Sequence, residues 1–394
     1  MKNEELLYKC NPVGYKQKFK NIYIKNGKIN IEINDKMLSN KVIRNISSYL
    51  NYINNRYRSV NFPVLFIFKQ IELLDKLSFV LLECIIKTYI TSHHKNIEIY
   101  FNAKSSILTD GITQSPLRFL CLTSNHENTN ERTAMFLSKF NSDLSYQHFR
   151  RLLKNEYFSK TDKLSKLYDE LTYFQIPFGI NQDCRDEITE VIIELIGNAV
   201  EHSESDCLLD FDIVQDYINS NNEKVYGINI AILNFSNYLL GDKLKEKYNS
   251  IIQNEDVSEN FSQISKAYSN HKKLFDIEYT EEDFFNITAF QNKVSSRYNN
   301  HTGGTGLTKL IKAIEDKSEN HACYVLTGKR IISFDNKYLE YNGDWIGFND
   351  NNDFFNKRPH PSILAKGSFF MPGTAYNLSF IMKVDEPNNE QNLF

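Results

Sequence analysis

A carboxylate and an amide stand four residues apart in an otherwise apolar segment, Glu194-Leu-Ile-Gly-Asn-Ala199. On a helix with about 100° per residue, Glu194 and Asn198 share a polar stripe that lies roughly 130° from the apolar face. The stripe comprises Glu187, Glu190, Glu194, Asn198 and Glu201. An amide oxygen at Asn198 suits Mg²⁺ as a hard ligand, and a carboxylate at Glu194 suits the activation of water. Alone, such a stripe is typical of a solvated face.

A glycine-rich segment about a hundred residues later favours a binding site over a solvated face. It contains Gly303, Gly304, Thr305, Gly306 and Leu307 and precedes a helical pattern that ends near residue 314. Glycines let backbone N–H groups turn toward an anion, and the amino end of a helix attracts negative charge. The segment is not a Walker A motif, because G-x-x-x-x-G-K-[ST] is missing. Just upstream, Ser295 and Arg297 are further candidate phosphate contacts.

The order of these two motifs resembles the GHKL ATP-binding superfamily of type II topoisomerases, Hsp90 chaperones, histidine kinases and MutL-type proteins. The resemblance covers residues 150 to 385 and implies a Bergerat-type fold that binds ATP and Mg²⁺. It implies that Asn198 holds the Mg²⁺ ion, that Glu194 is the catalytic base, and that residues 303–307 contact the phosphates. Residues 235–302 correspond to the lid that closes over the nucleotide in the family.

One motif departs from the family pattern D-x-G-x-G, in which the aspartate binds the adenine amino group. The strand that ends at Leu233 leads into Asn234, and Ser236 and Tyr238 occupy the two glycine positions. An amide offers both a carbonyl and an N–H group, so weaker discrimination between bases is expected. Near the end of the chain, Thr374 matches the family's hydroxyl that helps to hold the base.

The fold class expected from these patterns is α/β: a two-layer sandwich preceded by a smaller α/β domain. Strands at 61–68 and 96–101, with a helix at 73–92 between them, predict a parallel unit that is weakly similar to STAS domains. Residues 125–180 are expected to be mostly helical, and the last strands at 322–326, 330–334 and 375–384. The expected divisions are 1–120 (small domain), 121–150 (connector), 151–385 (ATP-binding domain) and 386–394 (tail).

Composition narrows the functional classes. The formal net charge of −3 gives no global attraction to nucleic acid. The six cysteines form no C-x-x-C pair, which argues against a zinc site or a disulfide framework and suits a reducing cytoplasm. The apolar runs are too short to span a membrane.

Three functional hypotheses follow. The first is an ATPase that acts as a nucleotide-driven conformational switch in a cytoplasmic bacterial regulatory, stress or defence system. It would act on a protein partner, STAS-like or effector, with nucleotide-dependent homodimerisation. The second is a protein kinase of the histidine-kinase or anti-sigma-factor type. Upstream, only His126 and His148 are candidate phosphoacceptors, and neither lies in a two-helix hairpin. The third is a scaffold that binds nucleotide without turnover.

Overall fold

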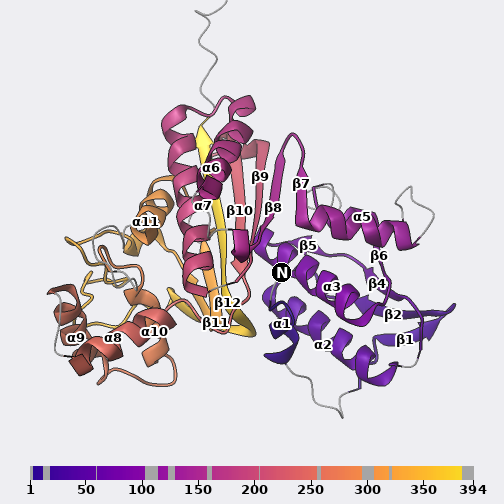
Figure 1. Cartoon of the computed structure of the whole chain (residues 1–394), viewed down its shortest axis with the longest axis horizontal. Coiled ribbons are helices and arrows are strands. Elements are labelled where there is room, and N and C mark those ends of the chain that lie inside the picture. Colours follow the sequence, from indigo (N-terminus) through magenta and orange to yellow (C-terminus); the bar gives the residue numbers. More distant parts are fainter. Residues whose placement is uncertain are drawn as a thin grey trace, which may run out of the picture.

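The computed structural model confirms a mixed α/β chain built on two large sheets. Figure 1 shows a unit of residues up to about 141 beside a larger unit that contains the rest of the chain. None of the helices in the described part of the chain is long and apolar enough to cross a bilayer. The structure describes residues 3–11, 18–58, 60–102, 114–122, 129–157, 162–203, 205–254, 259–294, 306–318 and 322–383.

The amino-terminal unit is a four-stranded sheet covered by helices. Its strands, in spatial order, are β1 (Ile22–Lys25), β2 (Lys28–Ile33), β4 (Val64–Phe68) and β6 (Ile97–Phe101). Strand β1 is antiparallel to β2, whereas β2, β4 and β6 are parallel to one another. The other elements are α1 (Leu6–Lys9), α2 (Asn40–Arg56), α3 (Lys76–His93), α5 (Thr129–Asn141), the short strands β3 (Met37–Leu38) and β5 (Glu72–Leu73), and a 3₁₀ turn (Pro116–Leu120). The predicted strand–helix–strand pattern is therefore confirmed at β4, α3 and β6.

Helix α3 is apolar almost all round because it is buried from two sides. Asp75 caps its amino end by accepting a hydrogen bond from the Ser78 N–H at 2.6 Å, and His94 ends it in a left-handed conformation. The helix buries a continuous series of residues from Leu77 to Ile86. A helix that faces solvent would carry only an apolar stripe. This one lies between its own sheet and the second sheet.

The second sheet has six strands, and neighbouring strands are antiparallel. In spatial order they are β11 (Tyr324–Ser333), β12 (Leu364–Lys383), β10 (Lys224–Asn234), β9 (Cys207–Ile218), β8 (His148–Leu153) and β7 (Ser142–Leu144). Strand β9 had no counterpart among the expected elements.

Two expectations about this region are wrong. The expected helical stretch 125–180 contains β7 and β8, so the expected connector 121–150 is divided between α5 and the second sheet. The two strands expected at 322–326 and 330–334 are one strand, β11. Its pairing with β12 shifts at Gly328, whose φ of +53° interrupts the regular alternation.

Helices cover both faces of the second sheet. Alternate residues of β10, such as Ile230 and Ile232, share a core with α6 (Asp162–Gln175), α7 (Gln182–Ser203) and α11 (Gly306–Lys317). The residues that alternate with these, Ala231 and Leu233, point to the other face and share a core with α2 and α3 of the amino-terminal unit. One continuous hydrophobic core therefore joins the two units, which is consistent with the packed arrangement in Figure 1.

The described part of the expected lid is a compact helical insertion. It comprises α8 (Asp242–Asn254), α9 (Glu259–His271) and α10 (Glu281–Thr288). A capping box between Thr280 and Asp283 starts α10, and Phe284 and Phe285 of this helix are fully buried. Of the expected lid, residues 255–258 and 295–302 lie outside the described residues.

Candidate functional site

Helix α7 carries the predicted polar stripe beside a buried apolar face. Ile188, Ile192 and Leu195 are fully or almost fully buried, whereas Glu194 and Asn198 are partly exposed. Among the described residues, none forms a side-chain hydrogen bond or ion pair with Glu194 or Asn198.

Two ion pairs fix the position of α11 against α7. Lys309, in the first turn of α11, lies 2.7 Å from Glu190, and Lys317, in the last turn, pairs with Glu187. The residue later in α11 meets the residue earlier in α7, so the two helices run in opposite directions. The amino end of α11, where the glycine segment ends, therefore points along α7 toward Glu194.

The predicted base contacts meet where the last residue of β10 pairs with the middle of β12. Asn234 ends β10, is buried, and is the direct partner of Thr374 on β12. The Asn234 amide donates to Ser205 Oγ at 3.1 Å. Ser205 lies two residues beyond the last residue of α7, so this contact brings the carboxyl end of α7 to the base side of the site. Sequence reasoning missed Ser205, whose only signal is its place between a helical pattern and the apolar run that starts at Cys207.

The turn that precedes Thr374 requires glycine. Gly373 has a φ of +94°, and a Cβ atom there would lie 2.4 Å from the carbonyl oxygen of Asn234 and 2.9 Å from the Ser236 nitrogen. This close approach presses the backbone of β12 onto the end of β10. It fixes the relative position of Asn234 and Thr374.

A serine closes the turn that has glycines in the family motif. Ser236 is buried, and its Oγ accepts a hydrogen bond from the Tyr238 N–H at 3.0 Å. At the next residue, the Leu239 N–H donates to Asp242 at 2.7 Å. Side-chain oxygens thus satisfy backbone donors in this loop, and left-handed glycines are not needed for its shape.

Part of the predicted phosphate site lies outside the described residues: Ser295, Arg297, Gly303, Gly304 and Thr305. Gly306 is the first residue of α11. Leu307 packs against the core shared by α7 and the second sheet. The structure therefore places the start of α11 against the polar stripe of α7, and it pairs Asn234 with Thr374 next to Ser205, which follows α7.

A buried ionic cluster joins the two units and was not predicted from the sequence. Arg150 on β8 is fully buried and pairs with Glu83 of α3 at 2.5 Å and with Asp210 of β9. Lys76, at the start of α3, pairs with Asp210 and Asp212. Burial alone would raise the pKa of Asp210, but the charges of Lys76 and Arg150 outweigh it and hold that pKa well below its usual value.

The contacts of His148 in this cluster bear on two roles, as a phosphoacceptor and as a metal ligand. Its Nε2 atom lies 3.2 Å from Asp210, and the side chain is buried, so it is not an accessible phosphoacceptor. His148, Asp210 and Asp212 also lie close enough to hold a metal ion, but the ammonium group of Lys76 already contacts both carboxylates.

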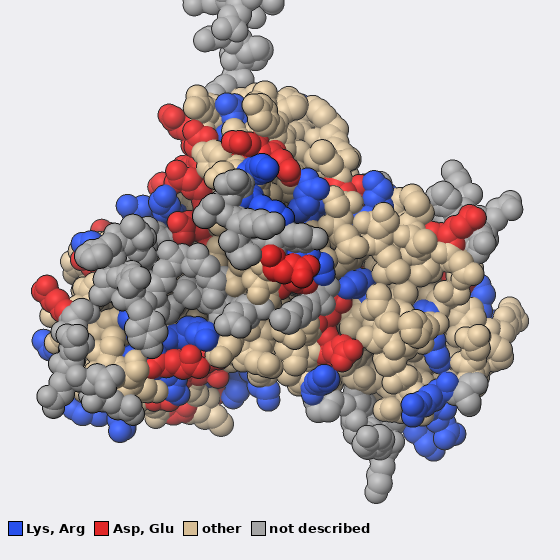
Figure 2. Space-filling model, viewed as in Figure 1, with Lys and Arg blue, Asp and Glu red and all other residues tan. Residues whose placement is uncertain are grey.

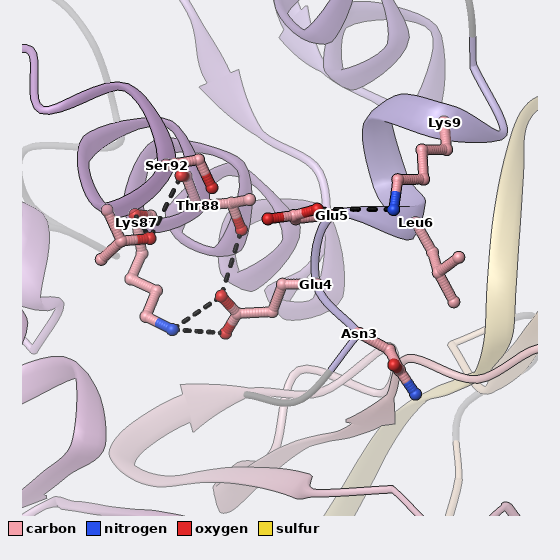
Figure 3. Close-up of a pocket in the computed structure, with 9 residues that line it drawn as sticks. Asn3, Glu4, Glu5, Leu6, Lys9, Lys87, Thr88 and Ser92 are labelled. Atoms are coloured by element: carbon pink, nitrogen blue, oxygen red, sulfur yellow. Dashed lines mark hydrogen bonds and ion pairs between the residues drawn. The ribbon is translucent and has the colours of Figure 1, made fainter.

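A polar pocket lies between α1 and α3 in the amino-terminal unit (Figure 3). Its central contact joins Glu4 to Lys87 at 2.6 Å, with Thr88 donating to the same carboxylate at 3.3 Å. Glu4 is buried, so these contacts neutralise a carboxylate that holds α1 against α3. None of the predicted nucleotide contacts lines this pocket.

Comparisons with protein-family models, with curated proteins and with solved structures give no significant match for this chain.

Proposed function

We propose that the protein binds ATP with Mg²⁺ in a site formed by α7, the start of α11, the end of β10 and the middle of β12. The observation that carries this proposal is the antiparallel pairing of α7 and α11. The ion pair between Lys309 and Glu190 brings the end of the glycine segment toward Glu194. The proposed metal-binding stripe of α7 and the amino end of α11, which attracts anions, then lie close together.

Each part of the site has a distinct chemical role in this proposal. Asn198 supplies an oxygen ligand to Mg²⁺, and residues 303–306 bind the phosphates through backbone N–H groups. Glu194 acts as the general base for slow hydrolysis. Asn234 and Thr374 contact the base, supported from behind by Ser205.

We propose that the output of this switch is the helical insertion α8–α10 or a protein partner. The amino-terminal unit shares a continuous core with β10 and β12 and is held by the buried Arg150 cluster, which supports a fixed rather than a hinged position. Acidic and basic side chains are interspersed over the face shown in Figure 2, which suits a protein partner better than nucleic acid. Action as a cytoplasmic bacterial ATPase with nucleotide-dependent homodimerisation belongs to the same proposal.

A second candidate function is nucleotide binding without turnover. The observation that favours it is Asn234, which stands where the family has an aspartate and already uses its N–H₂ group on Ser205. An altered base site would reduce affinity without changing the fold. Binding of ATP with no release of phosphate would select this alternative.

Isothermal titration calorimetry with ATP and a non-hydrolysable analogue, each with and without Mg²⁺, tests the proposal. The wild-type protein is expected to bind both ligands only in the presence of Mg²⁺. Asn198→Ala should abolish this Mg²⁺-dependent binding, because it removes the neutral oxygen ligand of the stripe. Gln182→Ala, an exposed substitution at the start of the same helix, is the matched control. No heat at millimolar ATP from folded wild-type protein would refute the proposed function.

A further inference from the structure

A single hydroxyl group joins the candidate base site to the helical insertion. Thr327 on β11 is fully buried, and its Oγ1 donates to the carbonyl oxygen of Gly373 at 3.0 Å. The same Oγ1 accepts a hydrogen bond from the Leu240 N–H, also at 3.0 Å. A threonine hydroxyl has one hydrogen to donate and lone pairs to accept with. Here it serves two backbone groups that are 46 and 87 residues away from it in the chain.

The first of these contacts reaches the base site. Gly373 immediately precedes Thr374, and its Cα packs against the carbonyl group of Asn234. Thr327 is also the direct strand partner of Thr374. The hydroxyl therefore holds the turn that sets the distance between Thr374 and Asn234.

The second contact reaches the root of the helical insertion. Leu240 precedes Gly241, whose N–H donates to Asn286 Oδ1 of α10 at 3.0 Å. A Cβ atom on Gly241 would lie 2.6 Å from the carbonyl carbon of Phe285, so the root packs directly against α10. A displacement of Leu240 would therefore move the contact between α8 and α10.

We propose that Thr327 is a positioning residue that couples occupancy of the base site to the position of the α8–α10 insertion. This inference rests on the proposed nucleotide site and assigns the route by which the base is sensed. A base that contacts both Asn234 and Thr374 from one face of the sheet moves the Gly373 carbonyl, and the Thr327 hydroxyl passes this movement to Leu240. The coupling needs both hydrogen bonds, because each reaches only one of the two segments.

The test compares three variants of the full-length chain. Thr327→Val keeps the shape of the side chain and removes both hydrogen bonds, whereas Thr327→Ser keeps the hydroxyl. Thr288→Val is the matched control, since Thr288 is equally buried but donates only to the Phe284 carbonyl of its own helix. If Thr327→Val does not fold, Thr327→Cys replaces it, because a thiol makes only weak hydrogen bonds.

Affinities for ATP and GTP and hydrogen exchange of residues 239–242 are measured for each variant. Thr327→Val is expected to weaken ATP binding about tenfold, to reduce the ATP-to-GTP preference, and to remove the protection that ATP gives to residues 239–242. Thr327→Ser should stay within about threefold of wild type. Thr288→Val should lose stability without a change in base preference.

The outcomes separate this inference from the function on which it rests. Wild-type protein that binds no nucleotide refutes the proposed function and the inference together. Wild-type binding that Thr327→Val leaves unchanged, in affinity, base preference and exchange, refutes the inference alone. The inference also fails if Thr288→Val or Thr327→Ser reproduces the full effect of Thr327→Val, because the loss would then follow from general destabilisation.

Discussion

The amide of Asn234 donates a hydrogen bond to Ser205 Oγ at 3.1 Å and so links the end of β10 to the residues that follow α7. This bond consumes part of the donor capacity of Asn234 and fixes the orientation of its side chain. The remaining carbonyl oxygen is the group that a bound base would meet. In the proposed function, Asn234 recognises the base through this oxygen, and Ser205 orients the amide.

Asn234→Asp is expected to sharpen the preference for ATP over GTP by about tenfold. A carboxylate only accepts hydrogen bonds, so it suits the adenine amino group and repels the guanine carbonyl, while the Ser205 hydroxyl can turn to donate. Competition binding with the two nucleotides measures the ratio. Asn229→Asp is the matched control, because Asn229 lies on the same strand and also pairs with a serine, Ser379. An unchanged ratio in Asn234→Asp would place base recognition elsewhere.

Glu194→Gln is expected to keep ATP binding and to slow hydrolysis by about 10²–10⁴-fold, the usual loss when a general base is removed. Phosphate release under saturating ATP measures the rate. Gln182→Ala, an exposed substitution at the start of the same helix, is the matched control and should hydrolyse ATP within a fewfold of the wild-type rate. Equal rates for Glu194→Gln and wild type would exclude Glu194 as the base.

Gly373→Ala is expected to lower the free energy of unfolding by about 3 kcal/mol, because it combines a left-handed backbone with a collision against Asn234. Gly343→Ala separates these effects, since Gly343 also has a positive φ, +65°, but nothing lies within 4 Å of its added Cβ. The control should therefore lose only about 1–2 kcal/mol. Urea unfolding measures both variants. Equal losses of unfolding free energy in the two variants would mean that the backbone at Gly373 moves away from Asn234 without an energetic penalty.

Arg150→Met is expected to lower the free energy of unfolding by about 3–5 kcal/mol, because Glu83 and Asp210 would remain buried without their shared cation. The neighbouring Arg151 forms an exposed pair with Glu170, so Arg151→Met should cost about 1 kcal/mol or less. Denaturant unfolding of the two variants gives the comparison. A small loss of unfolding free energy in Arg150→Met would show that water enters the cluster, or that a carboxyl group takes up a proton, when the cation is removed.

Stability is expected to fall as the pH is lowered below about 6.5, with His271 contributing. His271 is fully buried, and burial lowers its pKa although its Nε2–H donates to the Phe354 carbonyl at 2.7 Å. The folded state therefore binds a proton less readily than the unfolded state, so stability is lost as the pH falls through the unfolded pKa toward the folded one. Unfolding between pH 8 and pH 5 measures the slope. His271→Gln should flatten it, and an unchanged slope would assign the effect to other groups.

The sequence by itself determined the elements whose signal is local. The polar stripe with Glu194 and Asn198 is visible because an α-helix repeats every 3.6 residues, and α7 does bury the opposite face. The strand–helix–strand unit of β4, α3 and β6 was visible from two short strand-like runs on either side of a longer apolar run. Neighbouring residues fix these patterns, so no knowledge of distant contacts was needed.

Only the tertiary structure decided how these elements are combined. Glu83 and Arg150 are 67 residues apart in the chain, and Leu240 and Thr327 are 87 residues apart. No local sequence pattern predicts either contact. Strand β9 was missed because it is buried on both faces along its first half and so lacks alternation. Helix α3 is apolar almost all round because the second sheet covers a face that its own sheet leaves open. Burial of charges and pairing of strands depend on which surfaces meet, and this is a property of the whole folded chain.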